Sequence, residues 1–338
     1  MKYLILSIVL LNSVIGISQI DNPSADFPYP VMKIYDTDEY SAFTDLIRFK
    51  NAFYCSFRVG SSHVGGEDGK VRIIRSLDGK RWENVALLDK RGIDLRDPKL
   101  SITPDGRIMV IIGGSVYDGK ELLARRPQVS FSDPEGLSFS APEAVEIQPD
   151  DGKEDSWIWR VLWKGDTGYG MDYRTGNKKS WSLHLMKTKD GIHFEEVSSL
   201  DVDGLPNEAT IRFDENNNMY VLIRREGDDK HGMIARSTHP YTKWKYQKLD
   251  YRLGGPNFLI LNKQKWVVGT RKYKDEVKTQ ILVTNPKGKV KKTFVLASGG
   301  DTSYPGMLIY NEELWVTYYS SHEKGTNIYL TKIPLEDL

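Results

Sequence analysis

Apolar and polar residues along this chain fall into short runs that recur in pairs. In each pair, two apolar segments of strand length flank a polar turn, and helical periodicity is nearly absent. Runs of this kind, bounded by turn residues, predict β-hairpins. Six such hairpins start about fifty residues apart. Their sequences are "DLIRFKNAFYCSFR" from Asp45, "PKLSITPDGRIMVIIGG" from Pro98, "RVLWKGDTGYGMDY" from Arg160, "ATIRFDENNNMYVLIRR" from Ala209, "NFLILNKQKWVVGTRK" from Asn257 and "GMLIYNEELWVTYYSS" from Gly306.

A second turn sequence recurs between the hairpins, where weaker third and fourth strands are expected. It reads "SLDGKRW" from Ser76, "SDPEGLSF" from Ser132 and "TKDGIHF" from Thr188, with degenerate versions at Ser237 and Thr284. This pattern resembles the Asp-box, S-x-D-x-G-x-x-W/F, a hairpin turn of sialidase-like proteins. Its spacing follows that of the hairpins, so both signals describe one repeat.

Four short strands in a repeat of about fifty residues predict radially arranged sheets, an all-β β-propeller with six blades. The strand around "VMKIYD" and the closing strand "IYLTKIPL" are expected to complete one shared blade and to close the ring. A two-sheet sandwich is the alternative, but it does not explain the period.

The first 18 residues have the layout of a signal peptide. Lys2 precedes an apolar run over residues 3–14, and small residues follow at Gly16 and Ser18. Residues 19–338 are then expected to form a single propeller and catalytic domain, located in the periplasm or secreted. A buried N-terminal helix is the alternative for the apolar run.

Charge and cysteine content exclude several classes of function. The 47 basic and 46 acidic residues give a net charge of +1, which argues against nucleic acid or a membrane surface as partner. With one cysteine, Cys55, the chain has no internal disulfide and no cysteine-based metal site. No His, Asp and Glu pattern has metal-ligand spacing, and the Gly-Gly pairs lack a following helix. We therefore expect no metal, no cofactor and a monomer.

Residues with candidate catalytic or binding side chains are concentrated at one end of the predicted hairpins, which we call the loaded face. In a propeller, the start of each first strand and the end of each second strand lie on the same face, near the axis. The turns at the other face, "PDGR", "DENNN" and "NKQK", read as solvated loops. The residues at the loaded face are Asp45, Arg58, His63, Arg96, Asp97, Arg160, Asp172, Tyr173, Glu208, Arg224, Arg225, Asn257, Arg271, Tyr273, Asp301, Tyr304, Tyr318 and His322.

Several arginines converging near the axis predict a pocket for an anion, because a planar guanidinium fork suits a carboxylate or a sulfate. For any one arginine, a salt bridge to Asp45, Asp97 or Glu208 is the alternative. Trp157 and Trp159 are candidates for stacking on sugar rings or for packing. The expected ligand is an acidic oligosaccharide, held by Asp45, Arg58, Arg96, Arg160, Tyr173, Arg225, Asn257 and Arg271.

With these residues located, the mature chain resembles the sialidase-like propeller superfamily of secreted bacterial glycan-degrading enzymes. The segments "NEATI" from Asn207 and "DTSYPG" from Asp301 match the sialidase segments that carry the nucleophile and its partner. The resemblance implies that Tyr304 is the reactive phenol and that Glu208 assists it.

Two segments depart from that pattern. Sialidases open the first blade with an Arg-Ile-Pro motif that supplies one arginine of a carboxylate-binding triad, whereas this chain has "FTDL", with Asp45 and no arginine. Sialidases also carry an acidic proton donor in the loop after the first hairpin. Here that loop presents His63, with Glu67 and Asp68 beyond it.

These departures favour elimination from a uronic acid. Arginines that neutralise the carboxylate make the neighbouring proton easier to remove, and His63 would take it while Tyr304 protonates the departing oxygen, or the two exchange roles. His322 is the second candidate base, and a structural role is the alternative for His63. The product is a 4,5-unsaturated sugar. In this respect the chain resembles propeller-fold uronate lyases and the oligosaccharide dehydratases of marine flavobacterial ulvan breakdown.

The leading hypothesis is therefore a lyase or dehydratase acting on uronate-containing oligosaccharides such as ulvan fragments, with His63, Tyr304, Glu208 and His322 as catalytic candidates. Two alternatives remain. One is a retaining exo-glycosidase of sialidase type that uses Tyr304 as nucleophile. The other is a non-catalytic, glycan-binding propeller.

Overall fold

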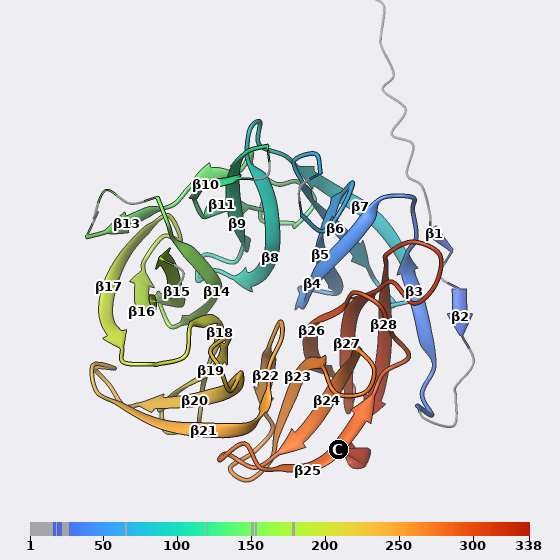
Figure 1. Ribbon diagram of the computed structural model, residues 1–338. Helices are drawn as coiled ribbons and strands as arrows, with labels where there is room; N and C mark the ends of the chain where they lie inside the picture. The colour runs from blue at the N-terminus through green and yellow to red at the C-terminus, as the bar shows by residue number, and fades with distance from the viewer. Residues whose placement is uncertain are drawn as a thin grey trace, which may run out of the picture.

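The computed structural model shows six β-sheets arranged in a ring about a central axis (Figure 1). The structure describes residues 16–17, 19–21, 27–64, 66–119, 121–149, 152, 154–177 and 180–338. The predicted all-β, six-bladed propeller is confirmed. The signal-peptide prediction falls largely on residues 1–15 and 18, outside the described residues; Gly16–Ile17 (β1) and Gln19–Asp21 (β2) pair with β7 and β3.

The inner hairpin of each blade is the unit that the sequence repeat predicts. These hairpins are β4–β5 (Tyr40–Phe49, Ala52–Gly60), β8–β9 (Asp94–Ile102, Ile108–Asp118), β14–β15 (Trp157–Lys164, Thr167–Asn177), β18–β19 (Pro206–Phe213, Met219–Arg225), β22–β23 (Asn257–Ile260, Trp266–Lys272) and β26–β27 (Thr302–Tyr310, Glu313–Ser320). Most first strands begin a few residues before the predicted start, and these added residues carry much of the candidate chemistry.

Outer strands complete the blades. They are β6 (Lys70–Ser76), β7 (Arg81–Leu88), β11 (Gln128–Phe131), β12 (Glu143–Ala144), β16 (Ser180–Thr188), β17 (His193–Leu200), β20 (His231–Ser237), β21 (Trp244–Arg252), β24 (Lys278–Thr284) and β25 (Val290–Val295). Two more short strands join them: β10 (Glu121–Arg125) pairs antiparallel with β9, and β13 (Glu146–Gln148) pairs in parallel with β17. A single-turn 3-10 helix, η1 (Leu335–Asp337), follows the last strand.

The two ends of the chain close the ring in one blade, as predicted. β3 (Val31–Tyr35) pairs with β28 (Asn327–Pro334), so the sheet runs β2-β3-β28-β27-β26. Figure 1 shows this blue strand beside the red strands. Phe53 of the first blade stacks on Trp315 of the last, with ring centroids 4.2 Å apart. Burying these rings between blades stabilises the closure.

The Asp-box turns form as the sequence predicts. In the first, Asp78 accepts hydrogen bonds from the backbone N–H groups of Lys80 and Arg81, and Ser76 accepts one from Gly79. Gly79 has φ +71, and a Cβ there would lie 2.3 Å from Trp315. Glycine is needed for both reasons.

Cys55 is a free, fully buried thiol inside β5. In the part of the chain that the structure describes, no helix is long and apolar enough to cross a membrane.

Candidate active site

Irregular strand pairing shapes the hairpins at the loaded face. In β4, β8, β14, β18 and β26 the pairing register shifts close to the axis, and the residues inside these shifts are Phe43–Thr44, Asp97–Pro98, Trp159–Arg160, Asn207–Glu208 and Tyr304–Pro305. A bulge re-aims side chains away from the regular alternation. Phe43, Asp97 and Tyr304 have φ values of 65°, 47° and 53°. Such left-handed conformations are uncommon for these residues and are often kept for function.

A tyrosine and a glutamate are joined at the centre of the site. The hydroxyl of Tyr304 donates a 2.5 Å hydrogen bond to Oε1 of Glu208. Arg224 Nη1 donates to the same Oε1 at 2.7 Å and to the Tyr304 hydroxyl at 3.2 Å, while the Gly255 N–H donates to Oε2 at 2.8 Å. Burial acts to raise the pKa of Glu208, but the Arg224 charge and these hydrogen bonds outweigh it and lower that pKa. Glu208 is therefore a carboxylate ready to accept the phenolic proton.

Aromatic side chains enclose Tyr304. Phe43 meets its ring edge-on at a centroid distance of 4.9 Å, and Trp159 and Tyr319 lie at 5.8 and 6.0 Å. Burial, and then the charge of Glu208, raise the pKa of Tyr304 well above its usual value. The phenol is therefore neutral until a base removes its proton.

A buried lysine lies beside this aromatic group. Lys99 Nζ is 4.8 Å from the Trp159 ring centroid and 5.8 Å from that of Tyr304. Burial lowers the pKa of Lys99 to about 8. A cation so close to the phenol ring favours negative charge on its oxygen.

The second arginine of the site is Arg271. It donates to the Thr302 carbonyl at 2.7 Å, to Asp301 at 3.0 Å and to the Tyr319 hydroxyl at 2.9 Å. Its guanidinium carbon lies 5.8 Å from the Tyr304 ring centroid. Arg224 and Arg271 therefore both lie beside Tyr304.

His63 lies on the other side of Phe43. Its ring meets Phe43 edge-on at a centroid distance of 5.1 Å. Nδ1 of His63 lies 2.5 Å from Asp301 Oδ2 and 3.1 Å from the Tyr40 hydroxyl, which also bonds Asp301. Burial opposes ionisation of Asp301, but the hydrogen bonds from His63 and Tyr40 lower its pKa to about 2. Because an ionised carboxylate can only accept, Nδ1 of His63 is the donor in the contact with Asp301.

Phe43 begins the segment "FTDL", which contains no arginine. Arg96, from the neighbouring blade, lies over the Phe43 ring with its Cζ 5.2 Å from the centroid. Its Nη1 donates to the His63 carbonyl at 2.9 Å. A guanidinium from β8 therefore lies beside this segment of β4.

The structure corrects the prediction that Arg58 and Arg225 line an anion pocket. Arg58 is 1% exposed; its Nε and Nη2 donate to Asp94 at 3.0 and 2.8 Å, and its Nη1 donates to the Ser62 carbonyl. Arg225 pairs with Asp203 at 2.9 Å and with Asp229 at 3.0 Å. Both are structural salt bridges, with partners other than those that the sequence suggested.

The sequence analysis selected Arg225 as a binding residue, whereas the structure places its neighbour, Arg224, against Tyr304. Consecutive residues of a strand point to opposite faces, so the site receives Arg224.

The remaining predicted binding residues are buried supports. Arg160 bonds Asp45 at 2.7 Å, and Asp45 also accepts the Leu100 N–H. Asn257 donates to the Pro305 carbonyl at 3.0 Å, which holds the segment after Tyr304.

Three aromatic candidates are enclosed rather than open to a sugar. Tyr173 stacks on Trp157 at 6.0 Å, with the Arg125 guanidinium 5.1 Å from its ring. Trp157 and Trp159 are 5% and 1% exposed, so packing is their role.

His322 is grouped with residues of β27 and β28. Its Nδ1 lies 2.8 Å from Ser320 Oγ, and its ring centroid is 4.9 Å from that of Tyr329. The histidine that the structure brings to Phe43 and Asp301 is His63.

Several site residues were missed as candidates by sequence reasoning. Arg224, Asp97 and Asp301 were placed on the loaded face but not selected, whereas Phe43, Tyr40, Lys99 and Tyr319 were not considered. The usable signal was the charge of Lys99 within the apolar run "PKLSI", because a lysine is rarely fully buried without a specific role.

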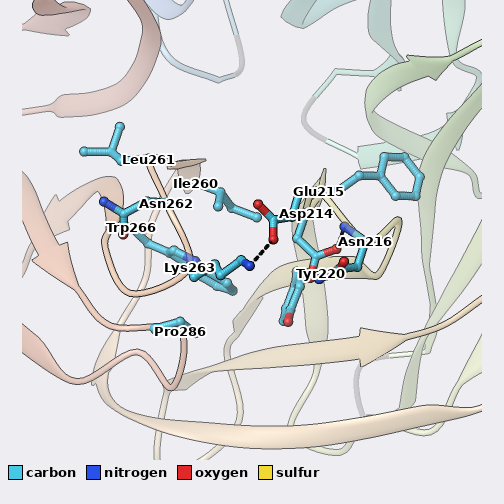
Figure 2. Close-up of a pocket in the computed structure, with 11 residues that line it drawn as sticks. Asp214, Glu215, Asn216, Tyr220, Ile260, Leu261, Asn262, Lys263, Trp266 and Pro286 are labelled. Atoms are coloured by element: carbon cyan, nitrogen blue, oxygen red, sulfur yellow. Dashed lines mark hydrogen bonds and ion pairs between the residues drawn. The ribbon is translucent and has the colours of Figure 1, made fainter.

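A cleft of about 370 Å³ lies at the opposite ends of blades four and five (Figure 2). It is bordered by the turns "DENNN" and "NKQK", and Lys263 and Glu215 form an ion pair of 2.5 Å across it. The tips of both turns, residues 215–217 and 262–264, are exposed, as expected of solvated loops. The turn "DENNN" joins β18 and β19 at the ends far from Glu208 and Arg224, and "NKQK" joins β22 and β23 at the ends far from Asn257 and Arg271, so the cleft is separate from the candidate site. Among the described residues, no group of three or more His, Cys, Asp or Glu side chains is arranged to hold a metal ion.

Solved structures resemble this chain over nearly its whole length. A protein of unknown function from Dyadobacter fermentans has a TM-score of 0.77 at 18% identity, covering 90% of this chain and 99% of that one. The NanB sialidase of Streptococcus pneumoniae has a TM-score of 0.72 at 12% identity, covering 96% and 71%. The Trypanosoma rangeli sialidase has a TM-score of 0.70 at 9% identity, covering 95% and 60%.

The fold is that of the sialidase propellers. At these identities the likeness concerns the fold alone, and this chain spans about 60% of the trypanosomal sialidase chain. No family model and no curated protein matches the sequence. The expected closeness to uronate lyases and dehydratases stays a prediction.

Proposed function

We propose that this sialidase-like propeller is a carbohydrate-active enzyme that hydrolyses glycosides of acidic sugars with Tyr304 as nucleophile. The observation that carries the proposal is the 2.5 Å hydrogen bond from the Tyr304 hydroxyl to Glu208, with Arg224 bonded to both. A nucleophile held by its base, which a third group orients, is the arrangement expected for covalent catalysis.

Proton transfer follows from the two shifted pKa values. Because the pKa of Tyr304 is raised and that of Glu208 is lowered, the phenol is neutral and the glutamate is charged. As the Tyr304 oxygen attacks the anomeric carbon, its proton passes to Glu208. Arg224 and Lys99 stabilise the negative charge of this pair as it shifts from Glu208 to the phenol oxygen during proton transfer.

A structural neighbour is consistent with this chemistry. The Trypanosoma rangeli sialidase is described in complex with 2,3-difluorosialic acid as a covalent intermediate. The acidic substrate class rests on Arg96, Arg224 and Arg271, which surround Tyr304 and Phe43 and can bind a carboxylate.

A second candidate function, elimination from a uronic acid, is favoured by the His63–Asp301 pair. The 2.5 Å contact orients the ring, and the His63 side chain is 42% exposed, so Nε2 is available as a base. Tyr304 would then donate its proton to the leaving oxygen. The product would be the 4,5-unsaturated uronate.

Trapping experiments distinguish the two reactions. Incubation with 2,3-difluorosialic acid and with 2-fluorouronosyl fluorides should give a covalent adduct, which intact-protein mass spectrometry detects and peptide mapping assigns to Tyr304. Release of deuterium from C5 of a labelled uronate, together with absorbance of an unsaturated product, would instead establish elimination. Binding without turnover in either assay would mark a non-catalytic propeller.

A further inference from the structure

Asp97 is a carboxylate held in an unfavourable state at the centre of the site. It lies in the bulge of β8 between Arg96 and Pro98, with φ 47° and 8% exposure. Its Oδ1 is buried and has no hydrogen-bond partner among the described residues. Buried polar atoms are almost always paired, and both the strained backbone and the orphan oxygen cost stability. A feature that costs stability at a candidate site needs a functional explanation.

The groups whose charges act on Asp97, or on which Asp97 acts, come from several blades. They are Arg96 and Lys99 of β8, His63 of the loop after β5, Tyr173 of β15, Glu208 of β18 and Tyr304 of β26. Burial is the largest influence and raises the pKa of Asp97, with Glu208 acting in the same direction and the two cations opposing it. The carboxyl group thus holds a proton more firmly than an ordinary aspartate does.

The loop that corresponds to the acid-bearing loop of sialidases brings a histidine, rather than a carboxyl group, to Phe43. His63 is the residue of that loop that reaches Phe43, and its Nδ1 is engaged by Asp301. Glu67 and Asp68, farther along the loop, are exposed. The candidate acid of the next blade is Asp97, which lies in the β8 bulge between Arg96, over the Phe43 ring, and Lys99, 5.8 Å from the Tyr304 ring centroid.

We propose that Asp97 is the general acid and base of the glycosidase reaction. This inference rests on the proposed function. It assigns to the second blade a role that the first blade of sialidases supplies, and its basis is the position and missing hydrogen bond of the Asp97 carboxyl beside the nucleophile pair.

The proposed steps balance as follows. In the first, the Tyr304 oxygen bonds to the anomeric carbon, the bond to the leaving oxygen breaks, Asp97 gives its proton to that oxygen and Glu208 takes the phenolic proton. In the second, Asp97 removes a proton from water, the water oxygen bonds to the anomeric carbon, the bond to Tyr304 breaks and Glu208 returns the proton. The sum is hydrolysis with retained configuration.

The test compares leaving groups in Asp97→Asn and Asp97→Ala. Glu67→Gln and Asp68→Asn are matched controls, because they remove exposed carboxylates of the loop. The substrates are sialyl and uronosyl oligosaccharides and the corresponding 4-methylumbelliferyl glycosides, whose leaving group needs little protonation. We expect Asp97→Asn to lower activity on the oligosaccharides about 100- to 1,000-fold and on the aryl glycosides less than about 10-fold. Azide should restore turnover of Asp97→Ala on the aryl glycosides and give a glycosyl azide.

Equal losses on both substrate types would overturn the assignment of Asp97 and leave Tyr304 as nucleophile. Full activity of Asp97→Asn, or the leaving-group pattern appearing in Glu67→Gln or Asp68→Asn, would do the same.

A wild-type protein inactive on both substrate types would defeat the proposed function, and Asp97 is then tested by stability. If Asp97 holds a proton in the folded state, the free energy of unfolding of the wild type should fall relative to Asp97→Asn as pH rises above about 4. Parallel curves between pH 4 and 9 would overturn the inference without any substrate.

Discussion

The guanidinium of Arg96 lies over the ring of Phe43, with its Cζ 5.2 Å from the ring centroid. Phe43 belongs to the first blade, whereas Arg96 comes from the second. Because Phe43 also packs edge-on against Tyr304, this contact places a positive charge near the candidate site.

Arg96 should be needed for acidic substrates. Arg96→Gln is expected to lower kcat/KM by about 10- to 150-fold, equivalent to about 1.5 to 3 kcal/mol, because it removes a charge-assisted contact to the carboxylate. Steady-state kinetics on an acidic glycoside and on its methyl ester measure this effect, and the ester should lose less. Arg107→Gln is the matched control, because Arg107 lies at the opposite face and pairs with Asp105. Equal losses on the acid and the ester would exclude a carboxylate contact.

Tyr304→Phe should abolish turnover and keep binding. The change removes the phenolic oxygen and leaves the ring between Phe43, Trp159 and Tyr319. We expect kcat to fall at least about 1,000-fold, with the dissociation constant of an acidic inhibitor changed less than about 3-fold. Tyr310→Phe, in the same strand but at its far end, is the control. Substantial turnover by Tyr304→Phe would remove it as nucleophile and as proton donor.

Arg58 should contribute to the stability of the fold rather than to substrate binding. Arg58→Met leaves Asp94 buried without its main partner, and breaking such a pair costs about 3 to 5 kcal/mol. Denaturant unfolding measures this cost. The double variant Arg58→Met/Asp94→Leu should recover part of the loss, because no unpaired charge remains. A stable Arg58→Met with normal m-value and lost activity would restore the original pocket interpretation.

The His63–Asp301 pair should give the protein an acid-sensitive component of stability. The pKa of Asp301 is lowered from 3.8 to about 2 in the folded protein, so this carboxylate stabilises the fold above about pH 4. That stabilisation is lost as pH falls toward 2, because the folded state then has to take up the proton. Asp301→Asn should therefore be less stable than the wild type at pH 5, and the two should converge near pH 2. Urea unfolding across this range measures the difference, and a constant gap would mean that Asp301 acts without its charge.

Local patterns were sufficient to predict much of this protein. The period of the hairpins defined six blades, and the Asp-box turns followed from residues within a few positions of one another, such as Ser76, Asp78 and Gly79. Closure of the ring by β3 and β28 was also predictable, because the chain left one incomplete blade at each end. Glu208 and Tyr304 were found because each lies in a short segment that resembles those of sialidases.

Tertiary structure decided which charged residues face the candidate site. Strict alternation cannot distinguish Arg224 from Arg225 unless the position of the bulge in β18 is known, and that bulge depends on pairing between strands. Arg58 was assigned to the pocket because Asp94, its partner 36 residues away, could not be identified from spacing.

The roles that we propose for Asp97 and Arg96 likewise depend on contacts between blades. A sequence records that a residue is charged, but its burial, its missing hydrogen bond and the charges that face it arise when distant strands meet at the axis. For this reason the chain alone predicted the propeller and the Tyr304–Glu208 pair, whereas the proton donor and the anion-binding groups that we propose depend on packing about the axis.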